Sequence, residues 1–288
     1  MKNIFRLIRP HQYVKNLFIF LPLFFAGQAQ HTELLFPAIL AFIAFSAAAS
    51  AIYILNDYLD IEEDRLHPRK KYRPLASGSI SKVKAKLLFI LLASIGFGLM
   101  SAVSINALYI LVAYVVMNFA YSIKLKHVAI MDISVIATGF VLRLFVGSEA
   151  TDVPLSMWIV MMTFLLALFM ALAKRRDDVL IFEDTGKKMR HVIEGYNLQL
   201  IDGAMMIMSS VVIVTYILYT TSTEVVERLK TEYLYITSVF VILGVMRYLQ
   251  ITFVEKNSGS PTQILLKDHF VQLVVLGWIL SYVWILYL

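Results

Sequence analysis

The sequence predicts an all-α protein that crosses a membrane many times. Apolar residues make up 59% of the 288 residues, charged residues only 16%, and the mean hydropathy is +0.75. About half of a soluble domain is apolar, so one soluble core could not bury this surplus. The apolar residues also gather in stretches of roughly 20, the length of a helix that crosses a bilayer. Helices are expected because they satisfy their backbone hydrogen bonds within the segment.

Nine of these stretches are expected to be transmembrane helices. The first is short and contains Pro22, and no linker, low-complexity tract or second domain separates the others. We therefore expect residues 1–288 to form a single transmembrane domain. The spans predicted from hydropathy are 14–28, 35–55, 84–102, 105–121, 131–149, 154–173, 199–220, 233–254 and 269–287.

The distribution of lysine and arginine predicts the orientation. The N-terminal segment and the loops after the second, fourth, sixth and eighth spans hold 22 of the 26 basic residues. Because basic loops stay in the cytoplasm, the N-terminus is expected there and the C-terminus outside. The net charge of +6 then indicates topology and contact with anionic headgroups, and no nucleic-acid partner is expected. The absence of cysteine excludes disulfides and thiolate metal sites.

An acidic motif follows the second predicted span directly. It reads Asn56-Asp57-x-x-Asp60-x-x-x-Asp64. On a helix these residues lie within an arc of roughly 100° and spread over about 12 Å, which suits two ions, or one ion with a polyphosphate. Oxygen ligands without His or Cys favour Mg²⁺. A solvated acidic helix end is the alternative, but carboxylates oppose the helix dipole at a C-terminus.

A basic stretch follows the acidic motif. Cations beside a metal-binding face suit a metal-bound diphosphate, and arginine makes bidentate contacts with phosphate. A loop that binds only lipid headgroups would explain the charge, but not the adjacent carboxylates. The acidic motif, followed by Arg73-Pro-Leu-x-Ser-Gly78, resembles the first motif of the UbiA-type intramembrane prenyltransferase superfamily. The resemblance covers essentially the whole chain. It implies nine helices around a central cavity open to the cytoplasmic side, where Mg²⁺ holds a diphosphate.

A second motif follows the fourth predicted span. The superfamily often has Asp-x-x-x-Asp here, but Asp132 is followed four residues later by Ile136, which weakens the case for a second, symmetric metal site. The pattern Tyr121-Ser-x-x-Leu-Lys126, with Asp132 and Arg143 beyond it, is similar to the polyprenyl-phosphate phosphoribosyltransferase branch (decaprenyl-phosphate 5-phosphoribose synthases). Three further patterns are similar to that branch: Arg9-Pro-x-Gln-x-x-Lys15-Asn16, Ala-Lys174-Arg175 and Ser260-Pro-x-x-Ile-Leu-Leu-x-Asp268.

The branch resemblance implies Mg²⁺-dependent transfer of 5-phosphoribose from phosphoribosyl diphosphate to a polyprenyl phosphate of the decaprenyl type. It also implies a place in the bacterial plasma membrane and in the synthesis of cell-envelope glycan precursors. The expected metal ligands are Asn56, Asp57, Asp60 and Asp64. The expected catalytic residues are Asp57, Asp60 and Asp132. The expected substrate-binding residues are Lys15, Arg73, Tyr121, Lys124, Lys126, Arg143, Lys174 and Arg175.

Several alternatives remain. Lysines near loops, such as Lys15 and Lys126, could only mark the cytoplasmic side. Arg143 lies roughly 18 Å into its span, where an arginine faces a cavity or a partner, or snorkels to the surface. The main functional alternative is prenyl transfer from a polyprenyl diphosphate to an aromatic acceptor such as 4-hydroxybenzoate. A transporter is less favoured, because the carboxylates lie at the ends of spans rather than near the midplane. The oligomeric state is open, and a homo-oligomer is compatible with the sequence.

Overall fold

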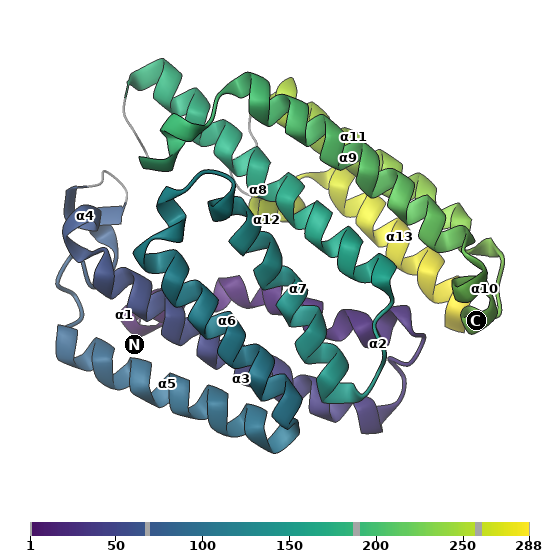
Figure 1. The fold of residues 1–288 in the computed structure, drawn as a ribbon, viewed down its shortest axis with the longest axis horizontal. Coiled ribbons are helices and arrows are strands. Elements are labelled where there is room, and N and C mark those ends of the chain that lie inside the picture. Colours follow the sequence, from purple (N-terminus) through teal and green to yellow (C-terminus); the bar gives the residue numbers. More distant parts are fainter. Residues whose placement is uncertain (1, 67–69, 187–190, 257–260, 288) are drawn as a thin grey trace. The chain divides into compact units, whose positions relative to one another are not determined.

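Helices are the regular secondary structure of the parts that the computed structural model describes, which are residues 2–66, 70–186, 191–256 and 261–287 (Figure 1). These residues contain no strand, so the predicted all-α class is confirmed. The helices form two compact units, one of Met1–Leu125 with Gly139–Leu155 and one of Lys126–Thr138 with Ser156–Leu288. The expectation of a single domain stays a prediction.

The elements follow one another without long connections. The first unit contains α1 (Lys2–Ile8), η1 (Pro10–Phe20), α2 (Leu21–Phe25), α3 (Thr32–Leu59), α4 (Ile61–Leu66), η2 (Lys70–Tyr72), α5 (Lys82–Val103), α6 (Ile105–Ile123) and the second half of α7 (Met131–Thr151). The second unit contains the start of α7, α8 (Met157–Thr185), η4 (His191–Gly195), α9 (Leu198–Thr221), α10 (Thr223–Leu229), η5 (Tyr233–Thr237), α11 (Ser238–Phe253), α12 (Pro261–Lys267) and α13 (His269–Tyr287). The short 3₁₀ helix η3 (Leu125–His127) lies at the boundary.

Eight helices among the described residues are long and apolar enough to cross a bilayer. The chain is therefore an integral membrane protein, and eight of the nine predicted spans fall on these helices. Helix α8 extends furthest beyond its prediction, because it continues to Thr185 instead of ending near residue 173. Gly186 then ends this helix with a φ of 65°, a conformation that glycine adopts without strain.

The first predicted span, 14–28, is not a single α-helix. It falls on the 3₁₀ helix η1 and the short α-helix α2, which follow each other directly. Pro10 and Pro22 each lie in the first turn of one of these helices, where the missing amide costs no hydrogen bond. A 3₁₀ helix rises about 2 Å per residue and an α-helix about 1.5 Å, so the pair covers roughly 30 Å. The ninth crossing therefore stays a prediction.

The first unit is built on close packing of α3 against α5. The middle of α3 is rich in buried alanine, and Gly96 of α5 lies directly against it. A Cβ at Gly96 would lie 2.9 Å from the carbonyl oxygen of Ala44 and 3.0 Å from the amide nitrogen of Ala48. Small residues of this kind let the backbones of membrane helices approach each other closely.

Replacement of Gly96 by Ala is expected to destabilise the folded protein by about 2 kcal/mol, because the added methyl group meets main-chain atoms that cannot rotate away. Gly98 is a matched control on the same helix, since a Cβ there would have no atom within 4 Å. Gly98→Ala is expected to be neutral, or to stabilise by up to about 1 kcal/mol. Thermal unfolding of both variants in one detergent measures the difference, and equal midpoints would contradict the close approach.

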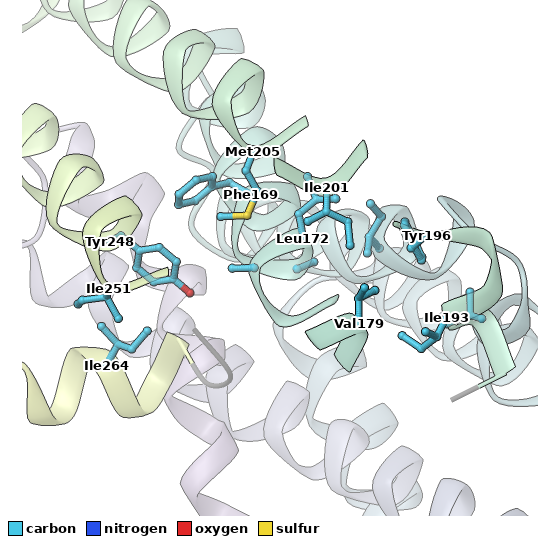
Figure 2. Packing of buried hydrophobic residues seen from close by; sticks show 14 residues of the cluster. Phe169, Leu172, Val179, Ile193, Tyr196, Ile201, Met205, Tyr248, Ile251 and Ile264 are labelled. Atoms are coloured by element: carbon cyan, nitrogen blue, oxygen red, sulfur yellow. The ribbon is translucent and has the colours of Figure 1, made fainter. Parts of the chain in front are cut away.

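The second unit has its own apolar core. Phe169 and Leu172 on α8 pack with Ile201 and Met205 on α9 in one cluster of buried residues (Figure 2). Tyr248 of α11 joins them, with its ring centroid 5.2 Å from that of Phe169. These contacts pack α8 against α9 and α11.

Candidate active site

The acidic motif lies where α3 ends and α4 begins. Helix α3 ends at Leu59, and Asp60 has a φ of −93° and a ψ of 10°, so the chain bends there. The predicted single helix through the motif is therefore interrupted. The amide of Asp60 still donates to Asn56 O at 3.0 Å, and the amide of Asp64 donates to Asp60 O at 2.8 Å. These two hydrogen bonds keep the motif in a helical course across the bend.

Arg73 draws two carboxylates of the motif together. Its Nη1 donates to Asp57 Oδ1 at 3.1 Å and to Asp64 Oδ2 at 2.7 Å. Arg9 Nη2, from the turn between α1 and η1, donates to the same Asp57 Oδ1 at 2.5 Å. Both carboxylates are 1% exposed. Burial raises the pKa of Asp64, although the neighbouring Arg73 and Lys70 oppose the shift.

The loop that carries Arg73 is compact, which explains how this arginine reaches the acidic motif. Pro74 and Leu75 are buried, and the amide of Ile80 donates to Pro74 O at 3.1 Å, so the loop folds back on itself. Gly78 has a φ of 74°, which a residue with a side chain would adopt only with strain. The Arg-Pro-Leu-x-Ser-Gly pattern therefore has a structural reason. Arg69, another cation of this stretch, lies outside the described residues.

The residues present fit a magnesium ion that is shared with a diphosphate. Asp57 Oδ2 is buried, and no described group forms a hydrogen bond with it. No three acidic or histidine side chains in the described ranges converge to form an all-protein metal cage. Mg²⁺ is usually held by one or two carboxylates together with substrate phosphates and water rather than by such a cage. Asp57 and Asp64 supply carboxylates of this kind.

The other residues of the first motif have varied surroundings. Asn56 Oδ1 is in hydrogen-bond contact with Ser122 Oγ at the end of α6, so the ends of α3 and α6 lie side by side. Tyr121 is half-buried and Lys124 is exposed at this same end of the unit. Asp60 is half-buried. The predicted roles of these residues in binding metal and substrate stay predictions.

A pocket of about 460 Å³ opens beside Asp57. Its lining comes from α1, the start of η1, the acidic motif and the Arg73 loop. The lining residues are Phe5, Arg6, Arg9, Pro10, His11, Asp57, Tyr72, Arg73 and Pro74. Burial lowers the pKa of His11, and the nearby Arg9 and Lys15 lower it further, which favours the neutral imidazole near pH 7. The pocket therefore combines three guanidinium groups and an imidazole with one carboxylate.

Sequence reasoning did not select Arg6, Arg9 or His11 as site residues. Arg9 and Pro10 were part of a pattern noted at the N-terminus, but their position beside Asp57 comes from a turn. Arg9 has a φ of 53°, in the left-handed region, and this turn separates α1 from η1. A basic flank before a predicted span has no pattern that distinguishes it from a topology signal.

Arg143 is buried in the interior of the first unit. Its Nε donates to Asn16 Oδ1 at 2.8 Å, its Nη1 to Gly139 O at 2.5 Å, and its Nη2 to Tyr114 OH at 3.3 Å. Its guanidinium carbon lies 4.8, 5.1 and 5.4 Å from the centroids of three aromatic rings, those of Phe45, Tyr114 and Phe140. The predicted substrate contact stays a prediction, and these contacts favour a role in holding η1 against α7.

The second unit carries a separate polar network around Asp132. This residue is fully buried, and its Oδ1 accepts a hydrogen bond from Tyr196 OH at 2.6 Å. Arg175 Nε lies 3.1 Å from Asp132 Oδ2, and Arg175 Nη1 lies 2.5 Å from Asp178 Oδ2. Tyr196 OH also accepts from the amide of Ile130 at 2.8 Å. Burial and the bond to Asp132 raise the pKa of Tyr196 well above its usual value. Sequence reasoning missed this tyrosine.

The basic residues 174–176 of α8, which continues to Thr185, differ in their surroundings. Arg176 is buried, and its Nε donates to Asp202 Oδ1 at 2.7 Å. Lys174 is exposed, and Lys126, in η3, is half-buried.

The pattern that ends at Asp268 lies before α13, and Asp268 accepts a hydrogen bond from Arg247 Nη2 at 2.6 Å. Ser260, which begins the pattern ending at Asp268, lies outside the described residues.

These features describe a membrane protein with a charged pocket beside the buried Asp57. Residues 16–273 match the UbiA prenyltransferase family, so the chain belongs to that family and is an enzyme of its superfamily. The predicted membership is thereby confirmed.

Two relatives make the comparison more specific. The decaprenyl-phosphate phosphoribosyltransferase of Mycolicibacterium smegmatis is 30% identical over 97% of this chain and 91% of its own length. The protein of the same name from Corynebacterium glutamicum is 27% identical over 98% of this chain and 86% of its own length. The predicted resemblance to the phosphoribosyltransferase branch is confirmed, and the aromatic prenyltransferase alternative is not favoured.

Solved structures show the same fold. A UbiA homologue from Archaeoglobus fulgidus, bound to GPP and Mg²⁺, has a TM-score of 0.71 and covers 99% of this chain and 100% of its own. The two sequences are 19% identical, so this likeness shows the fold alone.

Proposed function

We propose that this protein transfers 5-phosphoribose from phosphoribosyl diphosphate to a polyprenyl phosphate in a Mg²⁺-dependent reaction. The observation that carries the proposal is the pocket in which Arg6, Arg9 and Arg73 accompany the buried Asp57. Such a lining suits a donor with several phosphate groups. The curated relatives are named as decaprenyl-phosphate phosphoribosyltransferases, which supports the transfer of a phosphoribosyl group to such a lipid phosphate.

The reaction is a substitution at C1 of the ribose. A phosphate oxygen of the lipid forms a bond to C1, and the bond between C1 and the diphosphate oxygen breaks with its electron pair on the diphosphate. The lipid phosphate is already an anion at pH 7, so no strong general base is needed. A single displacement inverts the configuration at C1.

The residues of the first unit would stabilise the leaving diphosphate. A bound Mg²⁺ would supply positive charge where negative charge develops in the transition state. Asn56, Asp57, Asp60 and Asp64 would hold the ion, with the buried carboxylates of Asp57 and Asp64 nearest to Arg73. Arg73 would then be released from its two carboxylates and would pair with phosphate oxygens, since its donor geometry suits both partners.

Other cations would hold the remaining anionic groups. We assign Tyr121, Lys124 and Lys126 to the phosphates of the donor. Lys15, Lys174 and Arg175 would supply further positive charge for the phosphates of donor or lipid, and Asp132 would bind ribose hydroxyls or a second ion. Arg175 would have to exchange its present carboxylate partners for such a contact.

The proposed orientation places the acidic motif where a water-soluble donor is available. The excess of Lys and Arg in alternate loops supports an N-terminus in the cytoplasm and a C-terminus outside, in the bacterial plasma membrane. This orientation requires an odd number of crossings, with the segment of η1 and α2 as the additional one. The isoprenoid tail would remain in the bilayer while its phosphate reaches the donor.

The purified protein is expected to release diphosphate from phosphoribosyl diphosphate only when polyprenyl phosphate and Mg²⁺ are both present. Removal of Mg²⁺ with EDTA should stop the release, and renewed Mg²⁺ should restore it. A coupled assay for diphosphate and mass spectrometry of the lipid product measure the two sides of the reaction. Consumption of a prenyl diphosphate with an aromatic acid, without reaction of phosphoribosyl diphosphate, would contradict the proposal.

A further inference from the structure

The guanidinium groups of the Asp57 pocket are not equivalent. Arg9 and Arg73 already pair with Asp57, at 2.5 and 3.1 Å. Arg6 lines the same pocket and is exposed, and none of the described carboxylates pairs with it. Arg6 therefore brings positive charge to this pocket that no side chain of the described residues neutralises.

The turn at Arg9 presents Arg6 together with His11. The amide of Arg9 donates to Phe5 O at 3.1 Å, which closes the last turn of α1, and the amide of Gln12 donates to Arg9 O at 2.9 Å, which opens η1. Arg6 and His11 lie on either side of this turn, and both line the pocket. Because the Arg9 side chain is bound to Asp57, the turn is anchored to the acidic motif.

The pocket lining also bears on the kind of donor. A prenyl diphosphate carries its charge at one end, and its tail requires a continuous apolar wall beside the diphosphate site. Here the lining next to Asp57 is interrupted by Arg6, Arg9 and His11, which lie among Phe5, Pro10, Tyr72, Arg73 and Pro74. A molecule with a second anionic group, some distance from its diphosphate, matches this wall better.

We infer that Arg6 and His11 form a subsite for the 5-phosphate of the ribosyl donor, next to the diphosphate site at Asp57 and Asp64. This inference rests on the proposed function, and it assigns the recognition of the phosphomonoester to the α1–η1 turn. Arg6 would contribute a charge-assisted contact, and the neutral imidazole of His11 would donate one hydrogen bond.

Binding at the two ends of the donor can be measured separately with two smaller ligands. Ribose 5-phosphate has the phosphomonoester but no diphosphate, and inorganic diphosphate with Mg²⁺ has the diphosphate but no phosphomonoester. Arg6→Ala is expected to raise the inhibition constant of ribose 5-phosphate and the KM for phosphoribosyl diphosphate roughly ten- to a hundredfold, as expected for loss of one contact to a charged group. The inhibition constant of diphosphate and the KM for polyprenyl phosphate should change less than about twofold. His11→Ala should give the same pattern with a smaller shift, because it removes a neutral donor.

The matched control is Lys82→Ala, which removes an exposed positive charge at the start of α5, outside the pocket. It is expected to leave all four constants unchanged. The inference is overturned if Arg6→Ala weakens diphosphate instead of ribose 5-phosphate, or if it weakens neither. It is also overturned if the wild-type protein does not bind ribose 5-phosphate in calorimetry.

Failure of the proposed function has a different signature. In that case the wild-type protein would not turn over phosphoribosyl diphosphate at all, whatever the response of the Arg6 variant. Calorimetry with ribose 5-phosphate needs no turnover, so the subsite is tested separately from the reaction.

Discussion

Asp57→Asn is expected to lower turnover on the order of a thousandfold while the protein remains folded. The carboxylate loses its charge but keeps its shape, so a bound cation would lose a ligand and the leaving diphosphate its stabilisation. Arg9 and Arg73 would keep an oxygen acceptor at position 57 but would lose the negative charge that they share. Their side chains are 23% and 28% exposed, so water can take over part of these contacts and the fold should survive.

Diphosphate release, measured against Mg²⁺ concentration, checks this expectation, with thermal unfolding as the measure of folding. Glu62→Gln is the matched control, because Glu62 is an exposed carboxylate that pairs only with Arg65 among the described residues. The control should keep full activity. Turnover within about tenfold of wild type in Asp57→Asn would contradict an essential role for this carboxylate in catalysis.

Arg143→Met is expected to destabilise the first unit by about 3 kcal/mol and to raise the KM for the donor. Methionine keeps an unbranched apolar stem, but it is shorter than arginine and leaves the buried Asn16 Oδ1 without its donor, which costs roughly 1–3 kcal/mol. The contacts of the cation with three aromatic rings are lost as well, at about 0.5 kcal/mol or more each. The KM rises because η1 begins with Pro10 and His11, which line the donor pocket.

The register of η1 against α7 explains why one arginine has this effect. Asn16 contacts Arg143, and one turn further along, the backbone of Ile19 contacts the position where Gly147 lacks a side chain. Three residues of a 3₁₀ helix and four residues of an α-helix both advance about 6 Å, so successive turns of the two elements meet. Phe18 adds an edge-to-face contact with Phe140, at 4.9 Å between ring centroids.

A double-mutant cycle with Asn16→Ala tests whether Arg143 acts through this contact. The two changes should be non-additive by at least about 1 kcal/mol, because each removes the same hydrogen bond. Lysine at position 143 should restore only part of the stability, since it keeps the charge but not the forked geometry. Arg65→Met is the control for an exposed arginine and should cost less than about 1 kcal/mol. Additive effects would show that η1 is held by other contacts.

Hydropathy predicted most of the helices correctly, because the bilayer imposes one length and one polarity on every crossing segment. The segment of η1 and α2 departs from that rule. Its 3₁₀ turns match the turns of α7 in rise, and neither the hydropathy of a segment nor its number of charged residues predicts whether a helix is 3₁₀ or α. The extension of α8 was missed for a related reason. Its last turns are charged, but Arg175 and Arg176 are buried beside carboxylates of the same unit.

Some residues of the candidate site were predicted from local sequence patterns, and others were not. Asn56, Asp57, Asp60 and Asp64 were found because four oxygen-bearing side chains at short, fixed spacing are uncommon at the end of an apolar stretch. Arg73 was found because it belongs to the same local pattern. Tyr196 lies 64 residues from Asp132, to which its hydroxyl is bonded, and no short-range pattern connects the two.

The sequence by itself determined the membrane class, the eight long helices, the family and the acidic motif, since all of these depend on composition or on spacing within one segment. Only the tertiary structure decided which cations meet the acidic motif. Arg9 and Arg73 reach Asp57 from 48 and 16 residues away. A left-handed turn at Arg9 brings Arg6 and His11 to the same pocket. These contacts depend on how the chain turns between segments, and a basic residue beside an apolar stretch has the same local sequence whether it marks topology or binds a phosphate.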